Sequence, residues 1–217
     1  MFKIDQLIII GGPSLAGKSS LIEKIRQGDC PRLCEQLGIA IPSSWLYVGV
    51  KRLAHIRQPI IERLVVHFDI CSRYSQKNGF TYLHELINTN ISYLHELINI
   101  SDRVTILTLY VPPKILIQRS NFRLLKSLFR LSLSRVYRRK KHHLHLLGSI
   151  NRQWKRRKAY KHGFSMLLYE KWFNFFNQSG VTTHWVLDFN KSNIMIAHPY
   201  KTDKVGTFTG VKKVMDN

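Results

Sequence analysis

Eight residues near the start of the chain have the composition and spacing of a phosphate-binding loop. Residues Gly12–Ser19, with the sequence GPSLAGKS, match the pattern G-x-x-x-x-G-K-S/T in full, between an apolar run and a helical pattern. Glycines let backbone N–H groups surround phosphate oxygens, and the start of a helix adds a favourable dipole. In such a loop the lysine, here Lys18, contacts the β- and γ-phosphates, and the hydroxyl of Ser19 ligates Mg²⁺.

The segment therefore predicts a site for a nucleoside triphosphate and Mg²⁺. The predicted nucleotide-binding residues are Gly12, Pro13, Ser14, Leu15, Ala16, Gly17, Lys18, Ser19 and Ser20.

A carboxylate is the second group that this chemistry requires, and Asp69 is the leading candidate. It ends the apolar segment RLVVHFDI, and open α/β sheets place their ligands at the carboxyl ends of strands. Asp69 is predicted to hold Mg²⁺ together with Ser19, or to act as a general base on an acceptor hydroxyl; the alternative is a cap on the next helix. His67 shares its strand parity with Asp69 and is interpreted as a half-buried strand histidine.

Four apolar, β-branched segments are the predicted strands that position these groups. They cover Leu7–Ile10, Arg63–Ile70, Arg103–Val111 and Thr182–Phe189. Residues Ser19–Gln27 form the predicted helix after the loop, and Gly28 is expected to stop it. The segment Asp29–Pro59 is interrupted by prolines and is predicted to contain short helical pieces. After Asn190 we expect a last strand or a docked extension.

A short duplication separates the second and third predicted strands. The heptapeptide YLHELIN occurs at Tyr82–Asn88 and again at Tyr93–Asn99. An offset of eleven residues is about three helical turns, so the leucines stay on one face of a lengthened helix. Neither copy has the second histidine of a zinc-protease motif, and we assign the repeat no chemistry.

The charge of the chain indicates anionic partners. Its 217 residues include 34 Lys and Arg against 13 Asp and Glu, a net charge of +21. The stretch 103–169 has no acidic residue and holds 17 of the basic ones. Nucleotides, nucleic acids, acidic lipids and phosphorylated substrates all fit such a surface. The predicted helices here are Asn121–Leu147, with arginines between apolar positions, and Arg152–Asn177, whose aromatic residues are interpreted as core.

The cysteines and the apolar segments indicate the cellular compartment of the protein. Cys30, Cys34 and Cys71 are too few for a disulfide framework, and their spacing lacks the second pair of a zinc site. No segment reaches the length of a membrane span, and the N-terminus does not resemble a signal peptide. A cytoplasmic protein is expected.

The loop sequence GGPSLAGKSSLI resembles that of P-loop nucleoside triphosphatases, and within them the kinases of the adenylate, guanylate and shikimate type. Leu15 stands where guanylate kinases usually have glycine. The segment LTLYVPPKILIQR, a strand followed by a helix that carries Arg119, is similar to the approach to an arginine-bearing lid. The resemblance implies ATP as cofactor and Arg119 and Arg123 as catalytic residues beside Lys18 and Asp69.

The expected fold is therefore a three-layer α/β P-loop fold with a mostly parallel sheet, in one domain over 1–217 with a basic helical lid at 119–177. The expected function is a Mg²⁺–ATP-dependent kinase that phosphorylates a small hydroxyl- or phosphate-bearing acceptor. An ATPase that binds nucleic acid or another anionic polymer is the alternative, and a module that holds nucleotide without turnover is a third. The basic helices accordingly serve as a lid, as a nucleic-acid face or as a solvated face.

Overall fold

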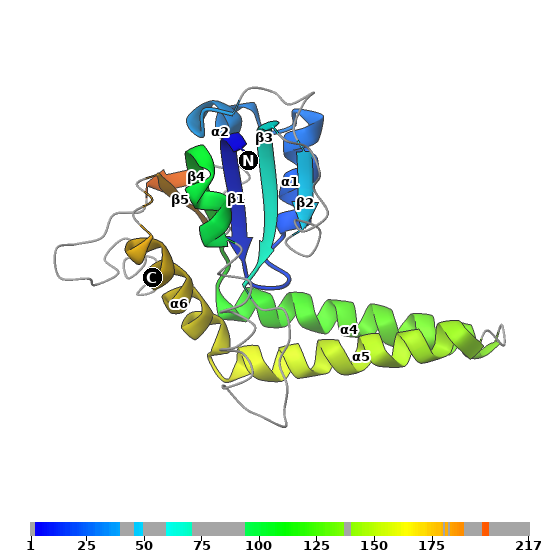
Figure 1. Ribbon diagram of the computed structural model, residues 1–217. Helices are drawn as coiled ribbons and strands as arrows, with labels where there is room; N and C mark the ends of the chain where they lie inside the picture. The colour runs from blue at the N-terminus through cyan, green and yellow to red at the C-terminus, as the bar shows by residue number, and fades with distance from the viewer. Residues whose placement is uncertain are drawn as a thin grey trace.

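The structure of the protein is a computed structural model (Figure 1). It describes residues 3–39, 46–49, 60–70, 94–136, 140–179, 181, 183–188 and 197–199. The four predicted strands are confirmed, as β1 (Lys3–Gly12), β3 (Ile60–Asp69), β4 (Ser101–Tyr110) and β5 (His184–Asp188). Two short strands join them: β2 (Leu46–Gly49), where helical pieces were expected, and β6 (Ala197–Pro199).

These strands form one sheet in the order β2-β3-β1-β4-β5-β6. The pairs from β2 to β5 are all parallel, and β6 runs antiparallel to β5. The mostly parallel α/β sheet predicted from the apolar runs is thus confirmed. From β1 the chain goes to one side of the sheet, then crosses to β4 on the other side. The sheet order therefore changes direction at β1, and ligands bind at such points in open α/β sheets.

Helices cover both faces of the sheet, and β1 is therefore buried on both sides. Leu7 and Ile9 belong to a cluster with the aromatic side chains of α6 (Phe164–Gln178). Ile8 and Ile10 belong to a second cluster, which includes Leu21 and Ile25 of α1 (Lys18–Gln27) and residues of α2 (Pro31–Gln36). Alternate side chains of a strand point to opposite faces, so a continuous apolar run supplies two cores.

Glycines bound the helix that follows the loop. Gly17 precedes α1 with φ 102°, and Gly28 follows it with φ 77°. The N–H of Gly28 donates to the carbonyl of Ile25 at 3.2 Å. The predicted end of this helix at Gly28 is confirmed, since glycine adopts the left-handed conformation without a Cβ clash.

The basic region is a helical hairpin rather than the predicted helix Asn121–Leu147, which is wrong. Helix α4 (Pro113–Val136) and helix α5 (Lys140–Lys161) lie side by side and project from the sheet (Figure 1). Leu124 and Leu131 are half-buried and share a helix face with Ser120, which bonds to α5, so folding back covers apolar positions that one long helix would expose.

The predicted helix Arg152–Asn177 is also divided. Gly163, with φ 72°, ends α5 and precedes α6. A left-handed residue cannot continue a right-handed helix, so the chain changes direction there. Helix α6 then packs its aromatic residues against the sheet, which confirms their interpretation as core. They are Tyr169, Trp172, Phe173, Phe175 and Phe176.

In the repeat, residues 94–99 of the second copy are helical, as expected. Leu94 and Leu97 are buried in the cluster that α6 also joins. The first copy, Tyr82–Asn88, lies outside the described residues, as does Cys71.

Candidate functional site

The loop Gly12–Ser19 connects the carboxyl end of β1 to the start of α1. It lies where the strand order of the sheet changes direction, between the ends of β3 and β4. Helix α1 has no side-chain cap on its first N–H groups and no acidic residue in its first turn. The positive end of the helix dipole therefore points into the loop, and no carboxylate of α1 neutralises it. Such a helix start is suited to binding an anion.

The backbone of the loop is held in unusual conformations. Leu15 has φ 78° and, among the described residues, is the only non-glycine with a positive φ. A left-handed conformation costs an L-residue roughly 1–2 kcal/mol. The side chain of Leu15 is buried in the cluster on the α1 face, which offsets that cost. Leu15 thus occupies a position that glycine would adopt freely.

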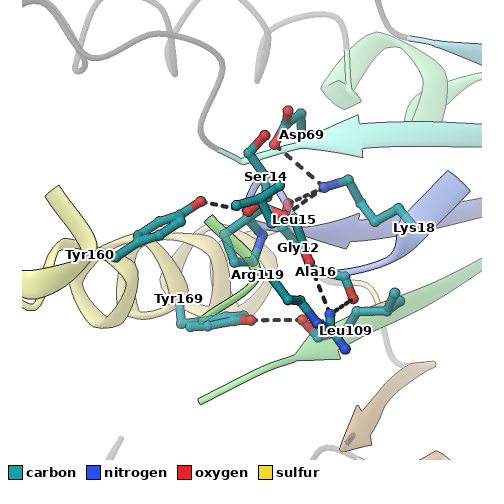
Figure 2. A network of polar contacts seen from close by, with 11 residues as sticks. Gly12, Ser14, Leu15, Ala16, Lys18, Asp69, Leu109, Arg119, Tyr160 and Tyr169 are labelled. Carbon is teal, nitrogen blue, oxygen red and sulfur yellow. Dashed lines mark hydrogen bonds and ion pairs between the residues drawn. The ribbon is translucent and has the colours of Figure 1, made fainter. Parts of the chain in front are cut away.

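Lys18 folds back across the loop (Figure 2). Its Nζ donates to the carbonyl oxygens of Gly12 at 2.7 Å and Pro13 at 2.8 Å. It also lies 3.4 Å from Oδ1 of Asp69, whose side chain is 34% exposed against 4% for Lys18. Gly12 lies opposite Asp69 in the β1–β3 register, and Lys18 bonds to the carbonyl of Gly12. The sheet therefore brings together Lys18 and Asp69, two of the predicted catalytic residues.

His67 lies near this ion pair on β3. Burial lowers the pKa of its imidazole, the charge of Lys18 lowers it further, and Asp69 opposes them. The ring is therefore neutral at pH 7. Its half-buried position confirms the interpretation drawn from strand parity.

Arg119 contacts the loop from the other side. Its Nη1 donates to the carbonyls of Leu15 at 2.9 Å and Ala16 at 3.0 Å (Figure 2). Burial is the main reason that its pKa lies below the usual value. Arg123 follows one turn later on α4 and is exposed. In this conformation Arg119 supports the loop backbone, and Arg123 is the more accessible of the two predicted arginines.

Two tyrosines form hydrogen bonds in the same region that the sequence did not predict. The hydroxyl of Tyr160 on α5 donates to the carbonyl of Ser14 at 2.6 Å. The hydroxyl of Tyr169 on α6 donates to the carbonyl of Leu109 at 2.8 Å and accepts the N–H of Val111 at 2.9 Å. The aromatic run 169–176 signalled a core for Tyr169. Tyr160 has no such signal, because its partner is 146 residues away.

A cleft of about 580 Å³ adjoins the loop, between α1 and α4. Apolar and cationic side chains line it together. The lining residues are Leu15, Gly17, Ser20, Leu21, Lys24, Gln118, Arg119, Phe122 and Arg123. The volume lies within the range of small-molecule sites. The structure thus places a cleft between the loop and the two predicted arginines, whereas Lys18, Ser19 and Asp69 do not line it.

Magnesium fits the donors that were predicted for it. Ser19 offers a hydroxyl in the first turn of α1, and Asp69 offers a carboxylate next to the loop. Mg²⁺ is typically held by one or two such oxygens together with water and substrate phosphates. Within the described residues no group of three or more His, Cys, Asp or Glu could hold a metal ion alone. A metal at this site would therefore need further ligands from water or a bound molecule.

Comparisons with known proteins give no further assignment. No family model, curated protein or solved structure matches this chain. In the part of the chain that the structure describes, no helix has the length and apolar character to cross a membrane.

Proposed function

We propose that the protein binds a nucleoside triphosphate with Mg²⁺ and transfers the terminal phosphoryl group to a small hydroxyl- or phosphate-bearing acceptor. ATP is the proposed donor, and P-loop kinase the proposed class. One observation carries the proposal: the GPSLAGKS loop joins β1 to the uncapped N-terminus of α1, with Lys18 beside the strand-end carboxylate of Asp69. A loop of this kind binds phosphate through backbone N–H groups and the helix dipole.

Each polar group has a role in this proposal. The ammonium of Lys18 moves from the carbonyls of Gly12 and Pro13 to the phosphate oxygens, a short rotation of a flexible side chain. The hydroxyl of Ser19 and the carboxylate of Asp69 hold Mg²⁺, which when bound neutralises charge on the phosphates. Asp69 alternatively accepts the proton of the acceptor hydroxyl.

Arg119 and Arg123 have different roles in this proposal. Arg119 keeps the backbone of Leu15 and Ala16 in place and is a positioning residue in this conformation. Arg123, exposed at the cleft, is free to approach the phosphoryl group, whose charge spreads over its outer oxygens during transfer. The cleft takes the base and sugar, with Phe122 and Leu21 as apolar contacts. We propose a reducing compartment such as the cytoplasm, since Cys30 and Cys34 are free thiols.

The proposal is tested in two stages with the full chain. Calorimetric titration is expected to show Mg²⁺-dependent ATP binding that Lys18→Ala weakens at least about tenfold, the effect of one charge-assisted contact. Lys161→Ala, at an exposed lysine of α5, is the matched control and is expected to bind like the wild type. Unchanged affinity in Lys18→Ala would show that the loop is not the nucleotide site.

The second stage is a phosphotransfer screen against nucleosides, nucleotides and sugars, with products identified by mass spectrometry. A phosphorylated product that requires Lys18 supports the kinase. The basic stretch 103–169 favours the alternative of an ATPase that binds nucleic acid or another anionic polymer. Hydrolysis accelerated many-fold by RNA or DNA, without any phosphorylated small molecule, would establish that alternative.

A further inference from the structure

Helix α4 exposes a row of large apolar side chains. Phe122 is 69% exposed, Leu125 64%, Phe129 66% and Leu133 43%. Their spacing of three or four residues places them on one face of the helix. Single exposed apolar residues are ordinary, but four in a continuous row mark an interaction surface.

The row is directed away from the partner helix. Helix α5 packs on the opposite face of α4, where Ser120 is buried and its hydroxyl donates to the carbonyl of Gln153 at 3.1 Å. Arg157 of α5 donates to Oδ1 of Asn121 at 2.5 Å. The hairpin projects from the sheet (Figure 1), and Leu125, Phe129 and Leu133 remain exposed, whereas Phe122 lines the cleft beside α1.

Cations lie along one side of this row. Arg123, Lys126 and Arg130 are exposed and follow one another at the same three- and four-residue spacing. No acidic residue occurs anywhere between positions 103 and 169. The surface therefore joins an apolar row to a positive row on one helix, and no acidic residue interrupts either of them.

We propose that α4 binds to the surface of an anionic lipid bilayer. The row of Phe122, Leu125, Phe129 and Leu133 enters the boundary between headgroups and acyl chains, and Arg123, Lys126 and Arg130 contact the lipid phosphates. Helices that lie in the membrane interface combine these two features, with Phe and Leu on one face and Lys and Arg beside it. Phe122 and Arg123 also line the cleft of the proposed nucleotide site, whereas the other residues of the two rows lie outside it.

The composition of the row favours lipid over two other occupants. Nucleic-acid surfaces use cations for phosphates and aromatic rings for stacking on bases. Leu125 and Leu133 have no part in that recognition, whereas they contribute directly to insertion among acyl chains. A second copy of the same surface would bring like charges together with no acidic residue to pair them.

The test is flotation of the full-length protein with vesicles. We expect binding to phosphatidylcholine vesicles that contain about 30% phosphatidylserine, at least about tenfold weaker binding to phosphatidylcholine alone, and partial loss in high salt. The double variant Leu125→Ser/Phe129→Ser is expected to lose about tenfold or more in vesicle affinity. Both side chains are exposed and lie outside the cleft, so its melting temperature and ATP affinity should match the wild type.

Two leucine variants test whether vesicle binding depends on the position of the leucine or only on the loss of an exposed leucine. Leu133 and Leu147 have nearly equal exposure, 43% and 42%, but Leu147 lies on α5 outside the row. Leu133→Ser is expected to weaken vesicle binding, and Leu147→Ser is expected to leave it unchanged. Lys126→Gln/Arg130→Gln should remove most of the preference for anionic vesicles.

Four results would overturn the proposal. The first is that the protein binds neither kind of vesicle, and the second is that the Leu133 and Leu147 variants lose equal affinity. The third is that the row binds random single-stranded RNA and vesicles do not compete. The fourth is that light scattering shows a dimer that Leu125→Ser/Phe129→Ser dissociates. The last two would assign the row to nucleic acid or to self-association. None of the four depends on whether the protein transfers a phosphoryl group.

Discussion

The ammonium of Lys18 lies 3.4 Å from Oδ1 of Asp69, although 51 residues separate the two in the chain. The contact follows from the sheet, because β1 and β3 run parallel with Gly12 opposite Asp69. A buried ammonium without partners would be costly, so the carboxylate and two backbone carbonyls stabilise Lys18 in this position. The same register places both charges at the loop where phosphate is proposed to bind.

Asp69→Asn removes the charge of this carboxylate and keeps its shape. Under the proposed function we expect ATP to bind still through Lys18, the effect of Mg²⁺ on affinity to decrease, and phosphoryl transfer to slow by about 10²–10⁴-fold. Titration calorimetry with and without Mg²⁺, together with the turnover rate, checks both parts. Asp102→Asn is the control, since Asp102 pairs with Lys3 on the surface. Full turnover in Asp69→Asn would reduce Asp69 to a structural partner of Lys18.

Leu15 allows the strain of the loop to be measured. Leu15→Ala and Leu15→Gly both remove a buried side chain, but only glycine adopts φ 78° without strain. We expect the glycine variant to exceed the alanine variant in free energy of unfolding by about 1 kcal/mol, measured by urea denaturation. At Leu133, inside α4, the order should reverse by a similar amount, because glycine is the poorer helix former. The same order at both positions would contradict the left-handed conformation of Leu15.

Gly11 permits the close approach of α6 to β1. A Cβ on Gly11 would lie 2.2 Å from Cζ2 of Trp172, whose indole N–H donates to Oγ1 of Thr108 at 2.8 Å. Gly11→Ala is therefore expected to lower the free energy of unfolding by about 1–3 kcal/mol. The smaller ring of Trp172→Phe should reduce that cost, and a double-mutant cycle measures the coupling.

The control for this effect is Gly148→Ala on α5. A Cβ there would meet only Arg152 Nη1, at 3.9 Å, so alanine should stabilise the helix by about 0.5–1 kcal/mol. Equal losses at Gly11 and Gly148 would indicate a general effect of glycine replacement rather than contact with Trp172.

Local patterns predicted the elements that carry the loop. The β-branched run before Gly12, the glycines on either side of α1 and the two prolines at the start of α4 each act within a few residues, so the sequence reveals them. The carboxylate at the end of β3 was also predictable, since parallel strands end at one edge of a sheet. Of the candidate site, the loop, Lys18, Asp69 and the approach of Arg119 were thus accessible to sequence reasoning.

Other features depend on distant contacts. The helical period of the basic region does not show where α4 ends and α5 returns, because the contacts that join them, such as Ser120 with Gln153, link residues 33 positions apart. The four-residue strand β2 is too short to give a pattern of its own. The bond from Tyr160 to Ser14 joins a helix to a loop at the opposite end of the chain, and no local signal predicts it.

Acidification is expected to destabilise the fold through His184. Its Nε2 lies 2.8 Å from Oγ1 of Thr108, and burial lowers the pKa of the imidazole to about 3. An unfolded histidine has a pKa of about 6.5, so the unfolded state binds more protons below that pH. The stabilising effect of neutral His184 is complete above pH 6.5 and decreases by about 1.4 kcal/mol per pH unit below it, or about 2 kcal/mol by pH 5.

Urea denaturation over a range of about pH 7.5 to 5, which spans an ordinary histidine pKa, tests this dependence through variants. His184→Gln keeps a polar group near Thr108 and cannot be protonated, so its stability should change much less over this range than that of the wild type. His67 contributes in the same direction because its pKa is also lowered, and only the difference between wild type and His184→Gln isolates His184. Parallel curves for these two proteins would show that folding does not lower the pKa of His184.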